Sequence, residues 1–242
     1  MHINAQKVGS KLESKKLVLA NWKSHKTLDE AMHWLAKVGP KAGASPYSVV
    51  LCPPFPFLAP LYTEIQAKKY AIKLGVQDLS PFPAGSYTGA VSERTLEGLG
   101  VVYALLGHSE RRRYFHETYQ EVANKVDLAI EAKIQPIVCL RKEDISPQYS
   151  ALSDDSAKKV IVLYETIGHI GTGEVESIES VLNSVQKIRS IFGYAVPIIY
   201  GGSVSDETRL LFLEHKELQG IVAATNSLDA DEFMKMIRQT NG

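Results

Sequence analysis

The carboxylate of Glu165 stands at the end of an apolar run, a position that suits acid–base chemistry. Residues 160–164 form this run, as in a parallel strand that is buried on both faces. A carboxylate at the rim of such a sheet tends to have a perturbed pKa, which is the property that a general base needs. Gly168, Gly171 and Gly173 follow, and they make a helix unfavourable. The pattern predicts a base followed by a lid loop, although an ordinary strand end before a solvated loop fits the same residues.

Polar side chains also follow three other apolar runs. Asn21 and Lys23 follow residues 17–20, His108 and Glu110 follow residues 101–106, and a Gly-Gly-Ser sequence ending at Ser203 follows residues 196–200. Taken singly, such a histidine is more often structural, such a lysine is more often a surface charge, and a Gly-Gly-Ser sequence is more often a turn. Together they would supply a neutral acid, a cation and backbone N–H donors beside the base, provided that the fold gathers them at one place.

The alternation of strand and helix patterns predicts such a fold. Strand patterns occupy residues 17–20, 49–52, 72–77, 101–106, 134–139, 160–164, 196–200 and 221–224, and the clearest helix patterns occupy residues 27–37, 118–132, 176–191, 205–213 and 229–239. Eight alternating units predict the α/β class, with a closed parallel eight-stranded sheet in a single (β/α)8 barrel. Active sites of such barrels lie at the C-terminal ends of the strands, where the polar residues above would meet.

The domain organisation predicted from the sequence is a single barrel domain over residues 17–242. Residues 1–16 form a polar lead-in with four lysines and no apolar core of a secretory signal, and we expect this segment to be partly disordered. Between the fifth and sixth strands, residues 140–155 contain Pro147 and several Ser and Asp residues, which predicts a shortened helix.

Composition narrows the possible partners. The formal net charge of the 242 residues is +0, so no global field favours nucleic acid, and the short run Arg111–Arg113 is better explained by an ion pair with Glu117 or a solvated helix start. No apolar segment has the length needed to span a membrane. The scattered histidines predict no metal site, because no pair has i,i+4 spacing. Cys52 and Cys139 lack CxxC spacing, which favours reduced thiols in a cytoplasmic protein.

Four motifs in this order resemble those of the triosephosphate isomerase family, and the resemblance extends roughly from Leu17 to the end of the chain. They are Asn21-Trp22-Lys23, the run from Gly107 to Arg112, Tyr164-Glu165 with the sequence Ile170-Gly171-Thr172-Gly173, and the run from Tyr200 to Val204. The resemblance implies a TIM barrel that interconverts dihydroxyacetone phosphate and glyceraldehyde 3-phosphate without a cofactor.

The resemblance also assigns roles to residues. It implies that Glu165 is the base, that His108 is a neutral electrophile, that Lys23 and Asn21 stabilise developing charge, and that Glu110 holds Lys23. Backbone N–H groups near Gly171, Ser203, Ala224 and Thr225 would bind the phosphate. The lid would comprise Thr166, Ile167, Gly168, His169, Ile170, Gly171, Thr172 and Gly173. A loop containing Gly85, Ser86, Tyr87, Thr88 and Gly89 would insert into the partner of a homodimer.

The chain departs from the family pattern at four places. The lid begins Thr166-Ile167-Gly168 where Pro-Val-Trp is usual, and Leu140-Arg141-Lys142 replaces Ile-Gly-Glu, so both halves of one lid contact are changed together. Ala224-Thr225 replaces a Gly-Gly pair near the phosphate, and Ala90 replaces an acid after the dimer loop. If the glycine pair requires a positive φ or a bare Cα, alanine and threonine would be poor substitutes, whereas alanine would fit a backbone in the region of a helix N-terminus.

Three functions follow from these residues. The retained set of Asn21, Lys23, His108 and Glu165 favours an active isomerase. The altered lid and the Ala224-Thr225 pair would suit a catalytically weak or inactive barrel that binds a phosphorylated metabolite. A role in protein interaction alone, through the loop at 78–89, is the third. Shortening the base by Glu165→Asp would separate the first two, because it should lower turnover by orders of magnitude and barely change a binder's affinity.

Overall fold

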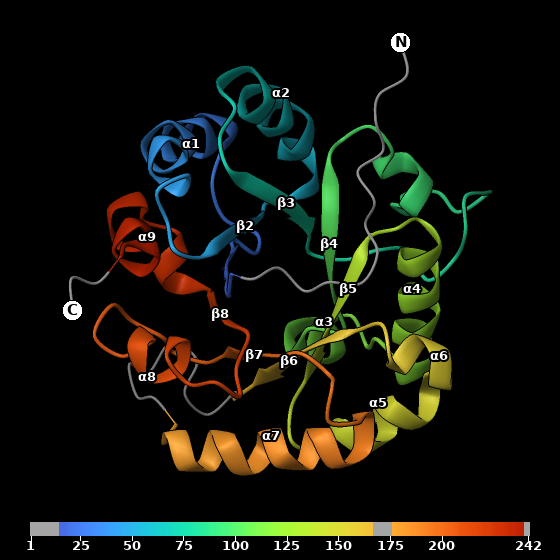
Figure 1. Ribbon diagram of the computed structural model, residues 1–242. Coiled ribbons are helices and arrows are strands. Elements are labelled where there is room, and N and C mark those ends of the chain that lie inside the picture. Colours follow the sequence, from blue (N-terminus) through green and yellow to red (C-terminus); the bar gives the residue numbers. More distant parts are fainter. Residues whose placement is uncertain (1–14, 167–175, 240–242) are drawn as a thin grey trace.

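The computed structural model describes residues 15–166 and 176–239, and its centre is a closed parallel barrel (Figure 1). Each strand pairs in parallel with the next, and the last pairs with the first, which confirms the predicted (β/α)8 architecture. The strands are β1 (Leu17–Asn21), β2 (Ser48–Cys52), β3 (Ile72–Val76), β4 (Val101–Leu106), β5 (Gln135–Leu140), β6 (Ile161–Glu165), β7 (Ile198–Gly201) and β8 (Gly220–Ala223).

Helices surround this barrel as an outer layer (Figure 1). They are α1 (Leu28–Ala42), α2 (Leu58–Lys68), α3 (Ser109–Tyr114), α4 (Tyr119–Glu131), α5 (Ile145–Ala151), α6 (Asp154–Ala157), α7 (Ile178–Phe192), α8 (Arg209–Leu213) and α9 (Ala230–Ile237), together with the short 3-10 turns η1 (Phe55–Phe57), η2 (Glu93–Leu96) and η4 (Thr225–Ser227). The two short helices α5 and α6 occupy the connection between β5 and β6, as the weak pattern of residues 140–155 predicted.

Local sequence explains where most helices begin. The side chains of Thr27 and Thr118 each accept a hydrogen bond from the backbone N–H of the third residue of the following helix. In return, the carboxylates of Glu30 and Glu121 accept a hydrogen bond from the backbone N–H of the capping threonine. The prediction for residues 205–213 was wrong at its start, because α8 begins only at Arg209. The Ser205 N–H donates to Thr208 Oγ1 at 3.0 Å, so residues 205–208 form a turn before the helix.

Two apolar layers hold the barrel together, and they alternate along each strand. In β1, Leu17 and Leu19 belong to the cluster inside the barrel, whereas Val18 and Ala20 belong to the larger cluster that also contains buried helix residues. Both layers exclude water, which explains why the strands have near-continuous apolar sequences. The alternation also directs the last residue of each strand towards the mouth or the wall of the barrel.

The ends of the described chain bear on two other predictions. Lys15 and Lys16, the last residues of the predicted lead-in, are hydrogen-bonded through Nζ to the carbonyls of Ser45 and His215, at 2.9 and 2.6 Å. Residues 1–14 lie outside the described part, so the expected disorder there stays a prediction.

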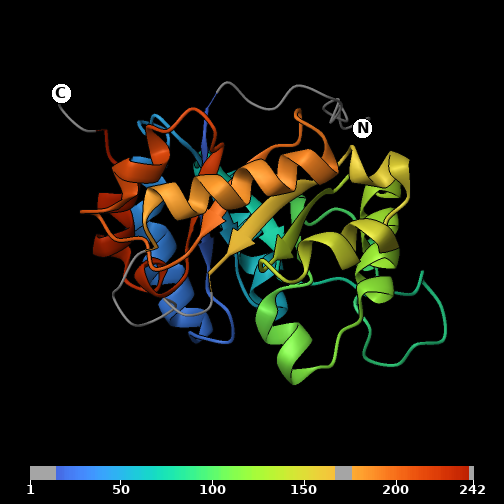
Figure 2. The ribbon, with the colours of Figure 1, turned by 90° about the horizontal axis from the view of Figure 1, so that it is seen from below.

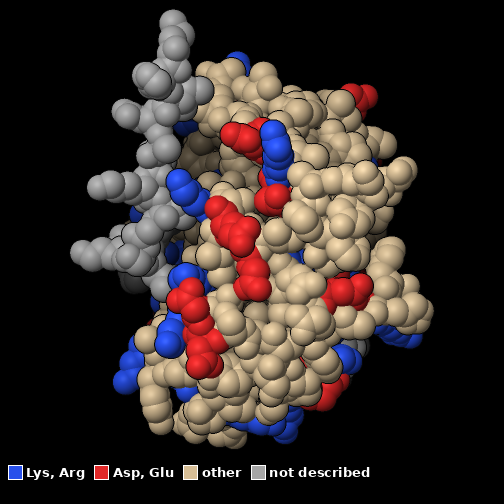
Figure 3. All heavy atoms as spheres, turned by 90° about the vertical axis from the view of Figure 1, so that its right-hand side faces the viewer, with Lys and Arg blue, Asp and Glu red and all other residues tan. Residues whose placement is uncertain are grey.

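Within residues 15–166 and 176–239, none of the helices has the length and apolar character needed to cross a bilayer. Acidic and basic side chains are interspersed on the face shown in Figure 3.

Candidate active site

A pocket of about 300 Å³ opens at the C-terminal ends of the strands. Its lining unites the ends of β1, β4, β6, β7 and β8, which are far apart in the sequence. The lining residues are Asn21, Lys23, His108, Leu163, Glu165, Gly201, Gly202, Ser203, Val204, Ser205, Val222, Ala224, Thr225 and Asn226. Asn21, Lys23, His108 and Glu165 were each singled out from the sequence, and the fold brings all four to this one pocket.

Lys23 is held at the pocket from both its backbone and its side chain. Its φ of 49° lies in the left-handed region, which costs a residue with a Cβ about 1 kcal/mol or more. The N–H of Lys23 donates to Asn21 Oδ1 at 3.1 Å, and Gln77 Nε2 donates to the Lys23 carbonyl at 2.9 Å. Its Nζ lies 2.7 Å from Glu110 Oε1. The backbone of Lys23 is therefore held by Asn21 and Gln77, and its ammonium group is held by Glu110 of α3.

His108 is the residue that caps α3. Its Nδ1 accepts the N–H of Glu110 at 3.2 Å, a contact that favours the tautomer with the ring proton on Nε2. Burial lowers the pKa of His108, but the charge of Glu165 and its hydrogen bond outweigh burial, so the net pKa lies above its ordinary value. This direction opposes the expected neutral form, whereas the contact at Nδ1 agrees with it. Neutrality of His108 therefore stays a prediction.

Glu165 ends β6 and is 4 % exposed. Its Oε1 lies 2.9 Å from His108 Nε2, and its Oε2 accepts the backbone N–H of Ser109 at 3.0 Å. Burial raises the pKa of Glu165, but the charge of His108 and these hydrogen bonds bring the net pKa below its ordinary value. A buried carboxylate that stays ionised near neutral pH, beside a ring that donates a proton, is an arrangement suited to moving protons.

The β7 and β8 ends, which lie between β6 and β1 in the barrel, form a further part of the pocket wall. Ser203, Ala224 and Thr225 all line it, as predicted for an anion site. Ala224 has a φ of −81°, and Thr225 is absent from the positive-φ residues of the described chain, so the backbone angle φ at neither position requires glycine. Asn226 Nδ2 donates to the Val204 carbonyl at 2.7 Å and ties the two loops together.

Other predicted residues lie elsewhere. Residues 167–173 of the expected lid, including the predicted phosphate-binding Gly171, fall outside the described residues. Of that lid only Thr166 is described, and it is buried. The segment Gly85–Gly89 lies away from the pocket lining and is exposed. Its Tyr87 stacks on Phe82, with ring centroids 4.6 Å apart. Among the described residues, no group of three or more His, Cys, Asp or Glu side chains is arranged to hold a metal ion.

Comparison with known proteins agrees with this geometry. The family model for triosephosphate isomerase matches residues 16–240. The chain belongs to the triosephosphate isomerase family. A triosephosphate isomerase of Alkaliphilus metalliredigens is 32 % identical over 92 % of this chain and 98 % of its own length. Those of Clostridium tetani and Clostridium botulinum are 33 % and 32 % identical, over 92 % and 91 % of this chain and 96 % and 98 % of their own lengths.

Membership of the triosephosphate isomerase family confirms the resemblance seen in the four motifs. Two residues that hydrogen-bond to residues of the pocket lining, Gln77 and Asn226, were missed from the sequence. Gln77 follows the third strand, so its position carried a signal of the same kind as Asn21 and His108. Asn226 follows the eighth strand and carried the same signal, but its contact with Val204, 22 residues away, depends on the pairing of β7 with β8.

Proposed function

We propose that this protein interconverts dihydroxyacetone phosphate and D-glyceraldehyde 3-phosphate, the reaction named by its family. The observation that carries the proposal is the meeting of three groups at one pocket of a family member: the Glu165 carboxylate, the His108 ring 2.9 Å from it, and the Lys23 ammonium. The reaction requires a base for a carbon-bound proton, a donor for the adjacent oxygen and a cation for the developing negative charge.

The proposed chemistry is a proton transfer between neighbouring carbons. Glu165 takes a proton from the carbon beside the carbonyl, while the Nε2–H of His108 donates a hydrogen bond to the carbonyl oxygen, which yields an enediolate. Lys23, aimed by Glu110, offsets the charge on this intermediate, and Asn21 adds a hydrogen bond. Glu165 then returns the proton to the other carbon, while the proton of the neighbouring hydroxyl group passes by way of His108 to the former carbonyl oxygen, so no redox agent or cofactor is consumed.

The phosphate of the substrate would lie at the β7 and β8 ends. Ser203, Ala224 and Thr225 line that side of the pocket, and the short turn η4 begins there. Because the net charge of the protein is +0, an anion has to be held by local groups, and backbone N–H groups at such positions can do so. Leu163 and Val222 add apolar wall nearer the barrel interior. A small phosphorylated substrate would therefore place its reacting carbons towards Glu165.

Steady-state isomerisation of glyceraldehyde 3-phosphate tests the proposal. We expect turnover from the wild type, loss of several orders of magnitude in Glu165→Ala and a smaller but large loss in Glu165→Asp, because proton abstraction depends on the position of the carboxylate. Glu131→Ala serves as the matched control, since Glu131 is exposed at the end of α4. A wild type that binds phosphorylated trioses without turning them over would instead identify an inactive binding barrel.

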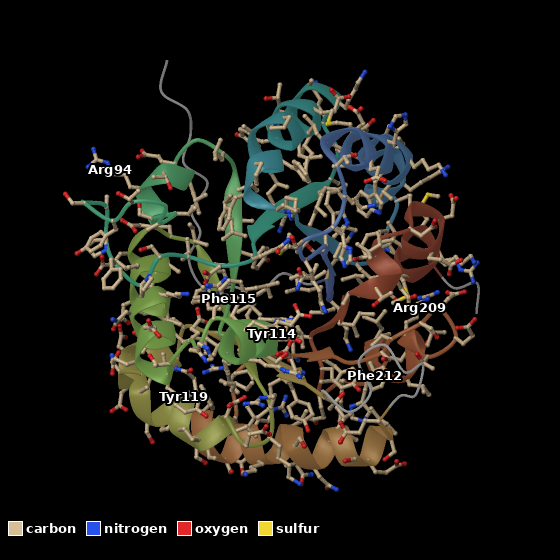
Figure 4. The ribbon with its side chains drawn as sticks, turned by 180° about the vertical axis from the view of Figure 1, so that it is seen from behind. Arg94, Tyr114, Phe115, Tyr119, Arg209 and Phe212 are labelled. Carbon is tan, nitrogen blue, oxygen red and sulfur yellow. The ribbon has the colours of Figure 1, made fainter. Side chains whose placement is uncertain are left out.

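We also propose that the protein is a homodimer. Four exposed aromatic side chains lie in the β3–β4 connection and at the end of α3: Phe82, Tyr87, Tyr114 and Phe115. These two segments project from the same side of the molecule in Figure 2, and Tyr114 and Phe115 are labelled in Figure 4. Exposed aromatic clusters mark association surfaces. Light scattering at micromolar protein should give twice the mass of the chain, and a monomeric mass would contradict the proposal.

We further infer a cytoplasmic location, which is supported by the two buried free thiols of Cys52 and Cys139. Cell fractionation tests it directly, and recovery of the protein with membranes or outside the cell would contradict it.

A further inference from the structure

Thr166, the residue directly after Glu165, is bound to the neighbouring strand through both its side chain and its backbone. Its Oγ1 lies 3.1 Å from the hydroxyl of Tyr200, and its N–H approaches the Gly201 carbonyl at 3.4 Å. Thr166 is buried, although its side chain carries a hydroxyl. Burying an unpaired hydroxyl costs free energy, so the hydrogen bond to Tyr200 favours the conformation in which Thr166 is held against β7.

Tyr200 gives the threonine a rigid partner. It lies in β7, is fully buried and stacks on Phe212 of α8 with ring centroids 4.3 Å apart and an angle of 20° between the ring planes. Phe212 is labelled on α8 in Figure 4. Because strand pairing and stacking both restrain this ring, the position of its hydroxyl is set by the barrel and by α8.

Gly202 makes room for the two hydroxyls. A Cβ at this position would lie 2.2 Å from the Tyr200 oxygen and 2.9 Å from Thr166 Oγ1, both closer than ordinary contact allows. Gly202 also lines the pocket, so the pair of hydroxyls lies directly behind the pocket wall. Three residues from β7 and the end of β6 thus share one closely packed arrangement beside the base.

On the C-terminal side of Glu165, the described restraints are the two contacts of Thr166 with β7. Glu165 ends β6, and its carboxylate contacts His108 and Ser109, which it must exchange for the substrate if it is to take a proton from carbon. During that exchange the side chain turns while the backbone has to stay in place. The first backbone unit after the strand belongs to Thr166, and the Tyr200 hydroxyl is what binds its side chain.

We propose that Thr166 is a positioning residue whose hydrogen bond to Tyr200 fixes the backbone beside Glu165 and thereby aims the base at the substrate. The inference rests on the proposed isomerase function. It concerns the hydroxyl and not the bulk of the side chain, so it distinguishes threonine from valine, which has nearly the same shape. It also predicts that Thr166 and Tyr200 act as one unit.

The test compares Thr166→Val, Thr166→Ser, Tyr200→Phe and the Thr166→Val/Tyr200→Phe double variant. We expect the two hydroxyl deletions each to lower kcat about tenfold while KM stays within about twofold of wild type, because the base is misplaced and substrate binding is not. Thr166→Ser keeps the hydroxyl and should retain wild-type kcat. Tyr200→Phe also removes the hydrogen bond of its hydroxyl with the backbone of Glu176, so its loss can exceed that of Thr166→Val. The double variant should lose no more than Tyr200→Phe, because the bond to Thr166 is already absent there.

Several results would overturn the inference. Wild-type kcat in Thr166→Val would do so, as would multiplicative losses in the double variant or a loss carried by KM alone. Circular dichroism and the thermal midpoint of each variant establish that it is folded at the assay temperature; if Thr166→Val does not fold, Thr166→Ala removes the same hydroxyl and is compared with Thr166→Ser in its place. A wild type without turnover would overturn the proposed function and this role together, whereas an active wild type with an unaffected Thr166→Val would overturn only this role.

Discussion

Oε1 of Glu165 lies 2.9 Å from Nε2 of His108, so the two groups proposed for proton transfer contact each other in the absence of substrate. The Glu110 N–H occupies Nδ1 of the ring, which leaves the Nε2 proton to face the carboxylate. Each group therefore perturbs the pKa of the other, and both perturbations depend on this contact.

The first prediction is that His108→Gln moves the acid limb of the kcat/KM profile to higher pH. Burial raises the pKa of Glu165, and the charge and hydrogen bond of His108 are the largest opposing causes. Their removal leaves burial dominant, so the base becomes protonated, and inactive, at a higher pH than in wild type. Profiles of both proteins with the same substrate make the comparison, because ionisation of the substrate phosphate is common to both. An unmoved limb in His108→Gln would contradict the assigned cause.

Gln77→Leu should weaken catalysis through Lys23. The substitution removes the hydrogen bonds from Gln77 to the carbonyls of Lys23 and Cys52, which help to hold Lys23 in its left-handed conformation. We expect kcat/KM to fall about tenfold and the free energy of unfolding to fall by about 1–2 kcal/mol. Gln120→Leu on α4 is the control, because that amide is exposed and contacts only Asn124 among the described side chains. Equal behaviour of the two variants would rule out the role of Gln77.

Ala224→Gly should bring no gain in substrate affinity. The negative φ of Ala224 is as accessible to alanine as to glycine. We expect KM within about twofold of wild type and a loss of about 0.5–1 kcal/mol in the free energy of unfolding, because glycine increases the entropy of the unfolded chain. Steady-state kinetics and urea unfolding measure the two quantities. A large fall in KM would show that the site does need the bare backbone.

Asn226→Ala should raise KM for the phosphorylated substrate. The Asn226 amide joins the β8 end to the Val204 carbonyl of the β7 end, and both ends line the proposed phosphate side of the pocket. We expect KM to rise about five- to tenfold, corresponding to a lost hydrogen bond, with a smaller change in kcat. Turnover of glyceraldehyde, which lacks the phosphate, is the control and should change little. An equal loss with both substrates would place the effect outside phosphate binding.

Asp144→Asn should lower stability in a pH-dependent manner. Burial raises the pKa of Asp144, but hydrogen bonds from Arg141 and Tyr119 bring it below its ordinary value. A depressed folded-state pKa contributes stability above the unfolded-state pKa of about 4, and this contribution is lost as pH falls through the folded-state value. We expect a loss of about 1–3 kcal/mol at pH 7. Urea unfolding at several pH values measures the free energy of unfolding of both proteins. The difference between them should shrink in acid, and a difference that does not change with pH would contradict this cause.

The sequence by itself determined the alternating elements, and through them the closed barrel. The patterns that predict these elements are local: apolar runs, capping pairs such as Thr27 with Glu30, and polar residues at strand ends. They can be recognised in the sequence without knowing which distant residues are in contact. For the same reason Asn21, Lys23, His108 and Glu165 could be selected before the fold was known. The start of α8 was misplaced because Ser205 and Thr208 satisfy each other in a turn, and composition alone does not distinguish such a turn from a helix cap.

Only the tertiary structure decided which distant groups meet and in what geometry. Gln77 acts on a residue 54 positions away, Asn226 on one 22 away, and Thr166 on one 34 away. Each contact forms because strand pairing and barrel closure bring separate strand ends to one rim, which no local periodicity encodes. The negative φ of Ala224 was likewise set by the closed β8 turn, so the replacement of a glycine pair there proved compatible with the backbone only once that turn was known.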